Sequence, residues 1–414
     1  MIKKSEFIWN TIGSIISSIL NAILLLFCTR INGTEVAGMF SISFATAIIL
    51  NAIGDFGIRI YQVTDTKKKY KFEDYLLSRI FVVSIMFIIG LLFVIISGYT
   101  IEKMMICILL ILFKVIDNLS ETYQAEFQIN GRLDIGGKSI VIRNCIAMIT
   151  FLIVDILTHN IVLACLGLFI SNAVLFILYD KTKIKQFVNI NKNLNKDAIK
   201  NIIKECLPLA ISTLLSMYIT NAVKYSIDIC GNYEMQTYFN IIYLPTFTIN
   251  LVSLLVIKPI LKPLGDSWNS NDKKGFMKIL LKLSAIILVA TVLIEIICAS
   301  IAIPILSIIY GVDLSMYKIE LMILVISGFF YAMATLVFYA LSTMRRQKQT
   351  TIAYIITSVF SLIIPYILVK KYGMMGTAIS NLLITIVLFL ILTIFCLMAY
   401  KKQFPQIAKT KSID

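Results

Sequence analysis

The sequence is poor in the residues on which metal proteins and many soluble enzymes depend. It contains one histidine, His159, among 414 residues, and none of its eight cysteines belongs to a Cys-x-x-Cys pair. A zinc or iron–sulfur site needs clustered cysteine or histidine ligands. We therefore expect no metal and no cofactor. Because most of the cysteines fall in apolar stretches, we interpret them as small buried residues.

Long polar segments are also missing. Charged residues make up only 15% of the chain, and the longest polar stretch, 180–204, is too short for a soluble domain. The connections expected outside the membrane are equally short, near 29–37, 98–103, 158–160, 228–236, 305–318 and 370–374. An external catalytic domain has no room there. This argues against an integral-membrane oligosaccharide polymerase or glycosyltransferase, and we expect a protein that is not an enzyme.

Hydrophobic residues fill the chain instead. They account for 59% of the residues, and the mean hydropathy is +0.89. About 20 mostly apolar residues are needed to cross a bilayer core of about 30 Å. The pattern therefore predicts an all-α polytopic membrane protein with twelve spans. They lie near 7–28, 38–61, 76–97, 104–125, 139–157, 161–179, 206–227, 237–258, 279–304, 319–342, 350–369 and 375–398.

The net charge of +15 is explained by topology. If the N-terminus is cytoplasmic, the segments expected inside hold most of the lysine and arginine. The segments expected outside hold Arg30, Lys103, Lys318, Lys370 and Lys371. Cytoplasmic loops of membrane proteins carry such an excess of positive charge. The distribution predicts that both termini are cytoplasmic, and it accounts for the basic charge without a nucleic-acid partner.

The predicted spans fall into two sets of six. We expect an N-terminal six-helix bundle over 1–180, a basic cytoplasmic linker over 181–204 and a C-terminal six-helix bundle over 205–414. Membrane transporters are commonly built from two repeated bundles, with the substrate site between them near the midplane. Because both halves begin and end inside, such a repeat would be parallel rather than inverted.

The fourth predicted span carries a polar stripe. Its members are Lys114, Asp117, Glu121, Gln124 and Gln128, spaced by three or four residues, so that they share one helical face. At about 1.5 Å per residue, Lys114 lies about 15 Å deep, near the middle of the bilayer. Charges at that depth are costly and face the protein interior or water. The stripe therefore predicts a functional surface inside the bundle.

Other predicted spans also contain polar or charged residues. Candidates to line a cavity are Asn10, Ser14, Ser17 and Asn21 of the first span. Charged candidates are Asp55 and Arg59 in the second span, Arg143 in the fifth, Lys224 in the seventh and Glu295 in the ninth. These patterns predict that several helices turn polar faces toward one aqueous cavity.

The deep cations suit an anionic ligand. Arginine presents a planar fork of donors that matches phosphate, and lysine acts as a mobile point charge. We expect Arg59, Lys114, Arg143 and Lys224 to bind substrate in this way. Structural alternatives stay open: Asp55 and Arg59 would form an intrahelical ion pair, whereas Arg143 and Lys224 would reach the membrane interface.

The carboxylates have two expected roles. Asp55, Asp117 and Glu121 would neutralise the cations when substrate is absent, or would take up protons or sodium to couple transport to a gradient. Glu295 is a further coupling or gating candidate, with a purely structural hydrogen-bonding role as its alternative.

Four segments carry a resemblance to a known family. They are Arg30-Ile-Asn-Gly-Thr-Glu-Val-Ala-Gly-Met-Phe-Ser, Gly54-Asp-Phe-Gly-Ile-Arg59, Leu207-Pro208-Leu-Ala-Ile-Ser212 and Tyr372-Gly373-Met-Met-Gly376-Thr-Ala378. In order and spacing they resemble the polysaccharide repeat-unit flippases (the Wzx type) of the multidrug/oligosaccharidyl-lipid/polysaccharide (MOP) exporter superfamily. The recurring arginines of that family match Arg30 and Arg59, so the resemblance implies that both are candidates to bind substrate.

The resemblance implies both a fold and a function. It implies two six-helix bundles in a V-shaped, MATE-like arrangement around a cationic cavity. It also implies translocation of undecaprenyl-diphosphate-linked oligosaccharides, for O-antigen, lipopolysaccharide or capsule, across the bacterial inner (plasma) membrane. The polysaccharide polymerase machinery is an implied partner. A drug or small-molecule exporter of the same superfamily is the alternative, although the first span lacks the acidic residue that such exporters often carry.

Overall fold

The computed structural model describes residues 4–65, 69–188 and 195–403, and this part of the chain is helical without strands. The helices are α1 (Lys4–Asp55), α2 (Ile58–Thr64), α3 (Phe72–Ile96), α4 (Ile101–Ile129), α5 (Leu133–Thr158), α6 (Ile161–Leu175), η1 (Phe176–Asp180), α7 (Lys181–Lys183), η2 (Ile184–Gln186), α8 (Lys196–Cys230), α9 (Tyr233–Ile242), α10 (Leu244–Asn269), α11 (Lys273–Ile297), η3 (Cys298–Ala302), α12 (Ile303–Tyr310), η4 (Ser315–Tyr317), α13 (Lys318–Thr343) and α14 (Gln347–Gln403).

Within the described residues, eight helical stretches are long and apolar enough to cross a membrane. Two of them, Ile8–Val63 and Gln347–Lys402, have 56 residues each. At about 1.5 Å per residue such a stretch exceeds twice the bilayer core of about 30 Å, so each accounts for two predicted spans. The fourth and eighth predicted spans correspond to α4 and α10. The all-α polytopic membrane fold is confirmed, whereas the number of twelve crossings stays a prediction.

Glycines interrupt the two longest helices. Gly33 in α1 has φ 83° and ψ 177°, and Gly373 in α14 has φ 56° and ψ −130°. Residues with a side chain rarely adopt this region, whereas glycine enters it freely. The external connection predicted over 29–37 is therefore helical apart from Gly33. Both glycines belong to segments on which the family resemblance rests.

The chain divides into two compact units, which we call unit 1 and unit 2. Unit 1 comprises Met1–Asp228 and Asn232–Thr237, and unit 2 comprises Ile229–Gly231 and Tyr238–Asp414. Unit 1 thus includes nearly all of α8. In the predicted linker, α7 and η2 make the first residues helical, and 189–194 lie outside the described residues. The assignment of bundles to 1–180 and 205–414 stays a prediction.

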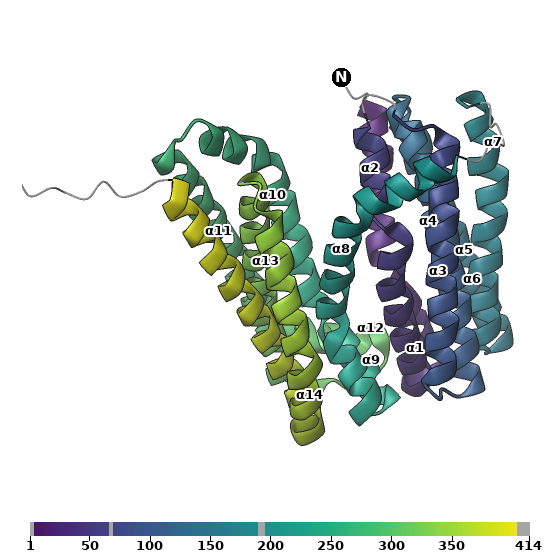
Figure 1. Cartoon of the computed structure of the whole chain (residues 1–414). Coiled ribbons are helices and arrows are strands. Elements are labelled where there is room, and N and C mark those ends of the chain that lie inside the picture. The colour runs from purple at the N-terminus through teal and green to yellow at the C-terminus, as the bar shows by residue number, and fades with distance from the viewer. Residues whose placement is uncertain (1–3, 66–68, 189–194, 404–414) are drawn as a thin grey trace, which may run out of the picture. The chain divides into compact units, whose positions relative to one another are not determined.

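Close helix contacts in unit 1 depend on glycine. Helices α3, α4, α5 and α6 run alongside one another (Figure 1). A Cβ atom on Gly137 of α5 would lie 2.5 Å from the backbone carbonyl carbon of Trp9 in α1. A Cβ atom on Gly54 would lie 2.6 Å from the Asn118 amide nitrogen of α4. The two glycines therefore bring the polar faces of α1, α4 and α5 within reach of one another.

Unit 2 has its own apolar core. Trp268 at the end of α10, Phe276 of α11, Leu341 of α13 and Leu392 of α14 belong to one buried cluster. The Trp268 and Phe276 ring centroids lie 5.2 Å apart. The Tyr400 ring stacks on Phe276 with a centroid distance of 6.2 Å, so the start of α11 is anchored to the end of α14.

Candidate functional site

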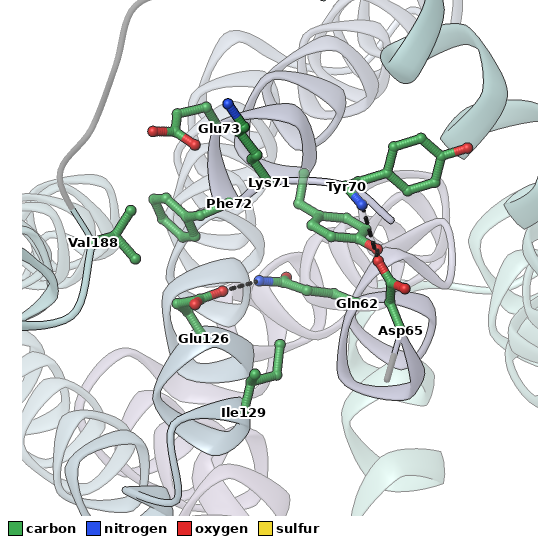
Figure 2. A pocket seen from close by; sticks show the side chains of 10 residues that line it. Gln62, Asp65, Tyr70, Lys71, Phe72, Glu73, Glu126, Ile129 and Val188 are labelled. Carbon is green, nitrogen blue, oxygen red and sulfur yellow. Dashed lines mark hydrogen bonds between the residues drawn. The ribbon is translucent and has the colours of Figure 1, made fainter. Parts of the chain in front are cut away.

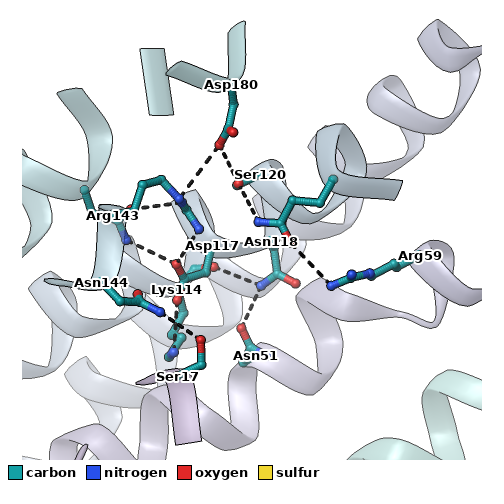
Figure 3. Close-up of polar contacts among 12 residues, drawn as sticks. Ser17, Asn51, Arg59, Lys114, Asp117, Asn118, Ser120, Arg143, Asn144 and Asp180 are labelled. Carbon is teal, nitrogen blue, oxygen red and sulfur yellow. Dashed lines mark hydrogen bonds and ion pairs between the residues drawn. The ribbon is translucent and has the colours of Figure 1, made fainter. Parts of the chain in front are cut away.

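A polar cavity of about 250 Å³ lies inside unit 1. Its lining comes from α1, α2, α4 and α5, and Figure 3 shows several of its side chains converging from these helices. The lining residues are Ser14, Ser17, Asn51, Arg59, Lys114, Asp117, Glu121, Gln124, Ile140, Arg143 and Asn144. The structure therefore brings many of the residues singled out in the sequence into one site.

The polar stripe of α4 forms one wall of this cavity. Lys114, Asp117, Glu121 and Gln124 all line it, whereas Gln128, the last member of the stripe, does not. The helix is regular from Ile101 to Ile129, so the spacing of three and four residues holds these side chains on one face.

Asp117 is the acceptor at the centre of the cavity wall. Its carboxylate lies 3.0 Å from Lys114 Nζ and 3.3 Å from Arg143 Nη2. Asn172 Nδ2 donates to it at 3.2 Å. A carboxylate offers about four lone-pair sites, so one side chain accepts from all three donors. Asp117 therefore forms ion pairs with two cations at once.

Arg143 is held from a second side by Asp180. Its Nε lies 3.8 Å from Asp180 Oδ2, and its Nη1 donates to Asn172 Oδ1 at 2.9 Å. Ser120 Oγ donates to the same Asp180 oxygen at 2.6 Å. Arg143 is only 2% exposed. The alternative in which Arg143 reaches the membrane interface is therefore wrong, because its partners retain it inside the bundle.

Arg79 of α3 is a buried cation that the sequence analysis did not identify. Its side chain is fully buried and donates to the backbone carbonyls of Gly54 and Asp55 at 2.6 and 2.7 Å. Its guanidinium also lies 3.7 Å from the Asp55 carboxylate and 3.8 Å from that of Glu121. Arg79 therefore binds the broken end of α1 to α4.

The end of helix α1 at Asp55 determines which cation pairs with this residue. The helix stops at Asp55 because Phe56 and Gly57 have positive φ values of 47° and 71°, and α2 begins only at Ile58. Asp55 and Arg59 are therefore not one helical turn apart on a common helix. Asp55 pairs with Arg79, and the alternative of an intrahelical ion pair with Arg59 is wrong.

Arg59 is the cation of the cavity wall that lacks a carboxylate partner. It donates to Gln124 Oε1 at 3.4 Å, and no Asp or Glu oxygen of the described residues lies within 4.0 Å of its guanidinium. Gln124 Nε2 in turn donates to Ser120 Oγ at 2.9 Å. The Arg59 guanidinium is therefore the charge most available to an incoming anion.

Charges in and around the cavity balance. The basic members are Arg59, Arg79, Lys114 and Arg143, and the acidic members are Asp55, Asp117, Glu121 and Asp180. Uncompensated charge in a low dielectric is costly, so paired charges are expected in a buried cluster. With all eight groups ionised, their formal charges cancel, so the cluster carries no formal excess of positive charge.

Six predicted site residues do not line the cavity, and one of them, Asp55, faces Arg79 beside it. Asn10 and Asn21 of α1 do not line the cavity, although Ser14 and Ser17 on the same helix do. Arg30 is exposed near Gly33, and Lys224 of α8 is buried without an ion pair to the described residues. Glu295 lies on α11 in unit 2, where its Oε2 atom is buried without a hydrogen bond in the described part of the chain.

A second charged contact lies at the predicted external end of unit 1. Lys103 Nζ lies 2.5 Å from Asp228 Oδ1, and Tyr99 Oη donates to Asp228 Oδ2 at 3.0 Å. Lys103 is predicted to lie in an external connection, but its side chain is buried. Burial and the nearby Asp228 carboxylate raise the pKa of Tyr99 above its usual value. The partners are 125 residues apart, so no local spacing reveals them.

A second cavity of unit 1, of about 340 Å³, lies at the turn between α2 and α3 (Figure 2). It is lined by Gln62, Asp65, Tyr70, Lys71, Phe72, Glu73, Tyr75, Glu126, Ile129 and Val188. Burial opposes ionisation of Asp65. Its carboxylate accepts hydrogen bonds from the Lys69 backbone N–H at 3.0 Å and from the Tyr75 hydroxyl at 2.8 Å, and these bonds outweigh the effect of burial. The pKa of Asp65 is therefore held below its usual range. These donors tie the turn to the start of α3.

The described residues contain no group of three or more His, Cys, Asp or Glu side chains arranged to hold a metal ion. The charged cluster instead consists of ion pairs and hydrogen bonds between protein groups.

Comparison with known proteins places these features in context. No protein-family model matches the chain. The capsular polysaccharide biosynthesis protein CapF of Staphylococcus aureus is 25% identical over 391 residues, which cover 92% of this chain and 95% of CapF. An inward-facing structure of a multidrug resistance MATE family transporter of the MOP superfamily has a TM-score of 0.73 at 13% identity, covering 94% of this chain and 96% of its own. The chain has the fold of the MOP superfamily.

Two further structures agree with this assignment. The MATE transporter VcmN of Vibrio cholerae has a TM-score of 0.59 at 12% identity and covers 97% of both chains. A MOP superfamily transporter from Pyrococcus furiosus has a TM-score of 0.56 at 13% identity, covering 96% of this chain and 94% of its own. The resemblance drawn from the four sequence segments is confirmed at this level. The protein is a multi-pass membrane protein of MOP fold with a relative in capsular polysaccharide biosynthesis.

Proposed function

We propose that the protein is a flippase that moves undecaprenyl-diphosphate-linked oligosaccharide units from the inner to the outer leaflet of a bacterial plasma membrane. The observation that carries the proposal is the polar cavity of unit 1, in which Arg59, Lys114 and Arg143 face one space. The match to CapF along nearly the whole of both chains supports a polysaccharide-related substrate. Such a protein is a transporter and catalyses no covalent chemistry.

The diphosphate is the part of this substrate that the cavity would recognise. Arg59 is open to it, whereas Lys114 and Arg143 are occupied by Asp117. Phosphate oxygens would compete with that carboxylate for the same donors, since both are anions that accept charge-assisted hydrogen bonds. Binding would therefore begin at Arg59 and proceed by exchange at Lys114 and Arg143. The glycan would cross in water, and the prenyl tail would remain in lipid.

The displaced carboxylates provide a route to coupling. Once phosphate binds Lys114 and Arg143, Asp117 loses its counter-charges and would take up a proton or sodium ion. Asp55 and Glu121, which face Arg79, are further candidates for cation uptake. A substrate drives the inward–outward switch only through different affinities for the two states. Neutralising the carboxylates in one state supplies such a difference. We propose that both termini lie in the cytoplasm, as the distribution of lysine and arginine predicts.

The test uses a deletion strain complemented with variants. We expect Arg59→Gln to lower surface polysaccharide and to leave completed undecaprenyl-linked units on the cytoplasmic leaflet. Arg59→Lys should restore part of the activity, because it keeps the charge but not the planar fork. Arg345→Gln, which removes an exposed arginine in unit 2, is the matched control and should behave as the parent.

Two outcomes would contradict the proposal. Single units that still reach the surface in the deletion strain would indicate a polymerase. Unchanged polysaccharide in a strain without a redundant flippase would exclude the flippase function. In that case changed drug susceptibility would identify a drug or small-molecule exporter, which the structural similarity to multidrug transporters favours as the second candidate.

Coupling has its own measurement. Asp55→Asn, Asp117→Asn and Glu121→Gln are combined, and transport is followed with and without an uncoupler. The membrane potential is held at zero, so that the uncoupler removes only the pH gradient, and we expect the remaining transport of the triple variant to be insensitive to the uncoupler. Sensitivity equal to that of the parent would rule out a coupling role for these carboxylates, whether or not Arg59 binds substrate.

A further inference from the structure

A basic groove lies on the surface of unit 2, remote in sequence from the cavity of unit 1. It is formed by the first three turns of α11 and by Tyr400 near the end of α14, with a volume of about 820 Å³. Its lining residues are Lys273, Lys274, Met277, Lys278, Leu281, Lys282 and Tyr400. Lysine is thus the only charged residue type in the lining.

The same face of α11 becomes apolar in the following turns. Lys274, Lys278 and Lys282 are exposed at intervals of four residues and share one side of the helix. Leu281, in the same region, is 62% exposed. Further along that side the exposed residues are Leu288, Val289, Val292 and Ile296. One exposed helix face therefore carries ammonium groups at its beginning and hydrocarbon over the rest of its length.

The lysines of the groove lack acidic partners. None of the four forms an ion pair with a carboxylate in the described part of the chain. Asp272, the nearest acid in sequence, is the N-cap of α11 and accepts from the Gly275 N–H at 2.9 Å. Lys273 Nζ lies 5.8 Å from the ring centroid of Tyr400, on the side toward α14. The lysine ammonium groups of the groove are therefore available to an anionic ligand.

The first turn of α11 contains lysines and no acidic residue. It begins with Lys273 and Lys274, and it shares the absence of Asp and Glu with the first turns of α10 and α14. A helix N-terminus carries partial positive charge, so acidic residues stabilise it and lysines do not. An anion seated among these lysines would relieve that repulsion and complete the helix start.

We infer that this groove binds an anionic phospholipid of the cytoplasmic leaflet. The phosphate headgroup would lie among Lys274, Lys278 and Lys282, and the acyl chains would follow the exposed apolar side of α11. Lysine ammonium groups bind phosphate as point charges on flexible stems and impose no fixed geometry. This suits an abundant bilayer lipid, because basic pockets on the cytoplasmic side of membrane helices attract acidic headgroups.

The experiment measures lipid retention by the full-length protein and requires no transport assay. The purified protein is exposed to phosphatidylglycerol, cardiolipin or phosphatidylcholine and examined by native mass spectrometry. The variant is Lys278→Gln/Lys282→Gln. The matched control is Lys370→Gln/Lys371→Gln, which removes two exposed lysines of α14 in the same unit. Size-exclusion chromatography establishes that both variants remain folded.

We expect the parent and the control to retain the two acidic lipids and the groove variant to bind them about 25-fold more weakly, at about fivefold per lysine. Equal loss in both variants, or equal retention of phosphatidylcholine, would overturn the inference. Undecaprenyl phosphate is added as a further arm. Loss of that lipid alone from the groove variant would assign the groove to the transported substrate and refute the phospholipid site. The result is independent of whether the protein flips oligosaccharides.

Discussion

Replacement of Arg79 by glutamine removes the charge that joins the end of α1 to α4. The guanidinium is fully buried, and it donates to the carbonyl oxygens of Gly54 and Asp55 while facing the carboxylates of Asp55 and Glu121. Glutamine keeps a donor but carries no charge and is shorter. The Arg79→Gln variant would therefore leave two carboxylates without their counter-ion.

The size of the effect follows from the burial of the partners. Removing one member of a buried ion pair costs about 3–5 kcal/mol, because the remaining charge is uncompensated. The side chains of Asp55 and Glu121 are 27% and 31% exposed, so water compensates them in part. We therefore expect about 3 kcal/mol, at the lower end of that range. In a domain of roughly 200 residues this corresponds to a fall in Tm of about 6–12 °C.

Thermal unfolding in detergent, followed by size-exclusion chromatography, measures this shift. Arg59→Gln is the internal comparison, because Arg59 makes one amide contact at 3.4 Å and no ion pair to the described residues. We expect its Tm to stay within about 2 °C of the parent. Glu121→Gln should restore part of the stability lost in Arg79→Gln. A Tm of Arg79→Gln equal to that of Arg59→Gln would refute the assignment of Arg79 to stability and Arg59 to binding.

Three further predictions concern single contacts. Gly33→Ala should lower stability by about 1–3 kcal/mol through backbone strain. A steric clash does not contribute, because no atom lies within 4 Å of the added Cβ. An unchanged Tm would contradict this prediction. Lys103→Gln should cost about 3 kcal/mol by stranding buried Asp228, and Asp228→Asn in the same chain should recover part of it. Asp65→Asn should cost about 1 kcal/mol at pH 7 by weakening the bond from Tyr75. The pKa of Asp65 is lower in the folded state than in the unfolded state. The stability that ionised Asp65 contributes is therefore fully present above the unfolded pKa of about 3.9, and it is lost as the pH falls through the lower pKa of the folded state. The Tm difference between parent and Asp65→Asn should therefore shrink below about pH 4.

The helical features were predictable where they depend on local periodicity. Residues Lys114, Asp117, Glu121 and Gln124 recur every three or four positions, and α4 is regular over that stretch, so their common face follows from helix geometry. The same holds for the apolar spans, whose length and hydropathy identify a membrane protein. The superfamily fold followed from the resemblance of four short segments rather than from periodicity.

The partners in the charged cluster depend on tertiary structure. Arg79 lies at the start of an apolar span, where an arginine ordinarily reaches the interface, and its acceptors are backbone carbonyls exposed by the end of α1. That end is created by positive φ at Phe56 and Gly57. A spacing of four residues therefore suggested a pair between Asp55 and Arg59 that the chain geometry prevents.

Because the formal charges around the cavity of unit 1 balance, the voltage dependence of transport would report whether the proposed substrate crosses with or without a cation. A diphosphate that enters a cluster with balanced formal charges adds net negative charge unless Asp117, Glu121 or Asp55 takes up a cation. If no cation accompanies it, each charge that crosses contributes about 2.3 kcal/mol per 100 mV to the driving force. If each charge is matched by a proton or sodium ion, the potential has no effect. We expect flipping in proteoliposomes to be nearly insensitive to an imposed potential in the parent and to become sensitive in Asp117→Asn, which can no longer take up and release a cation. A parent and variant with the same voltage dependence would show that Asp117 does not take up the cation that accompanies the substrate.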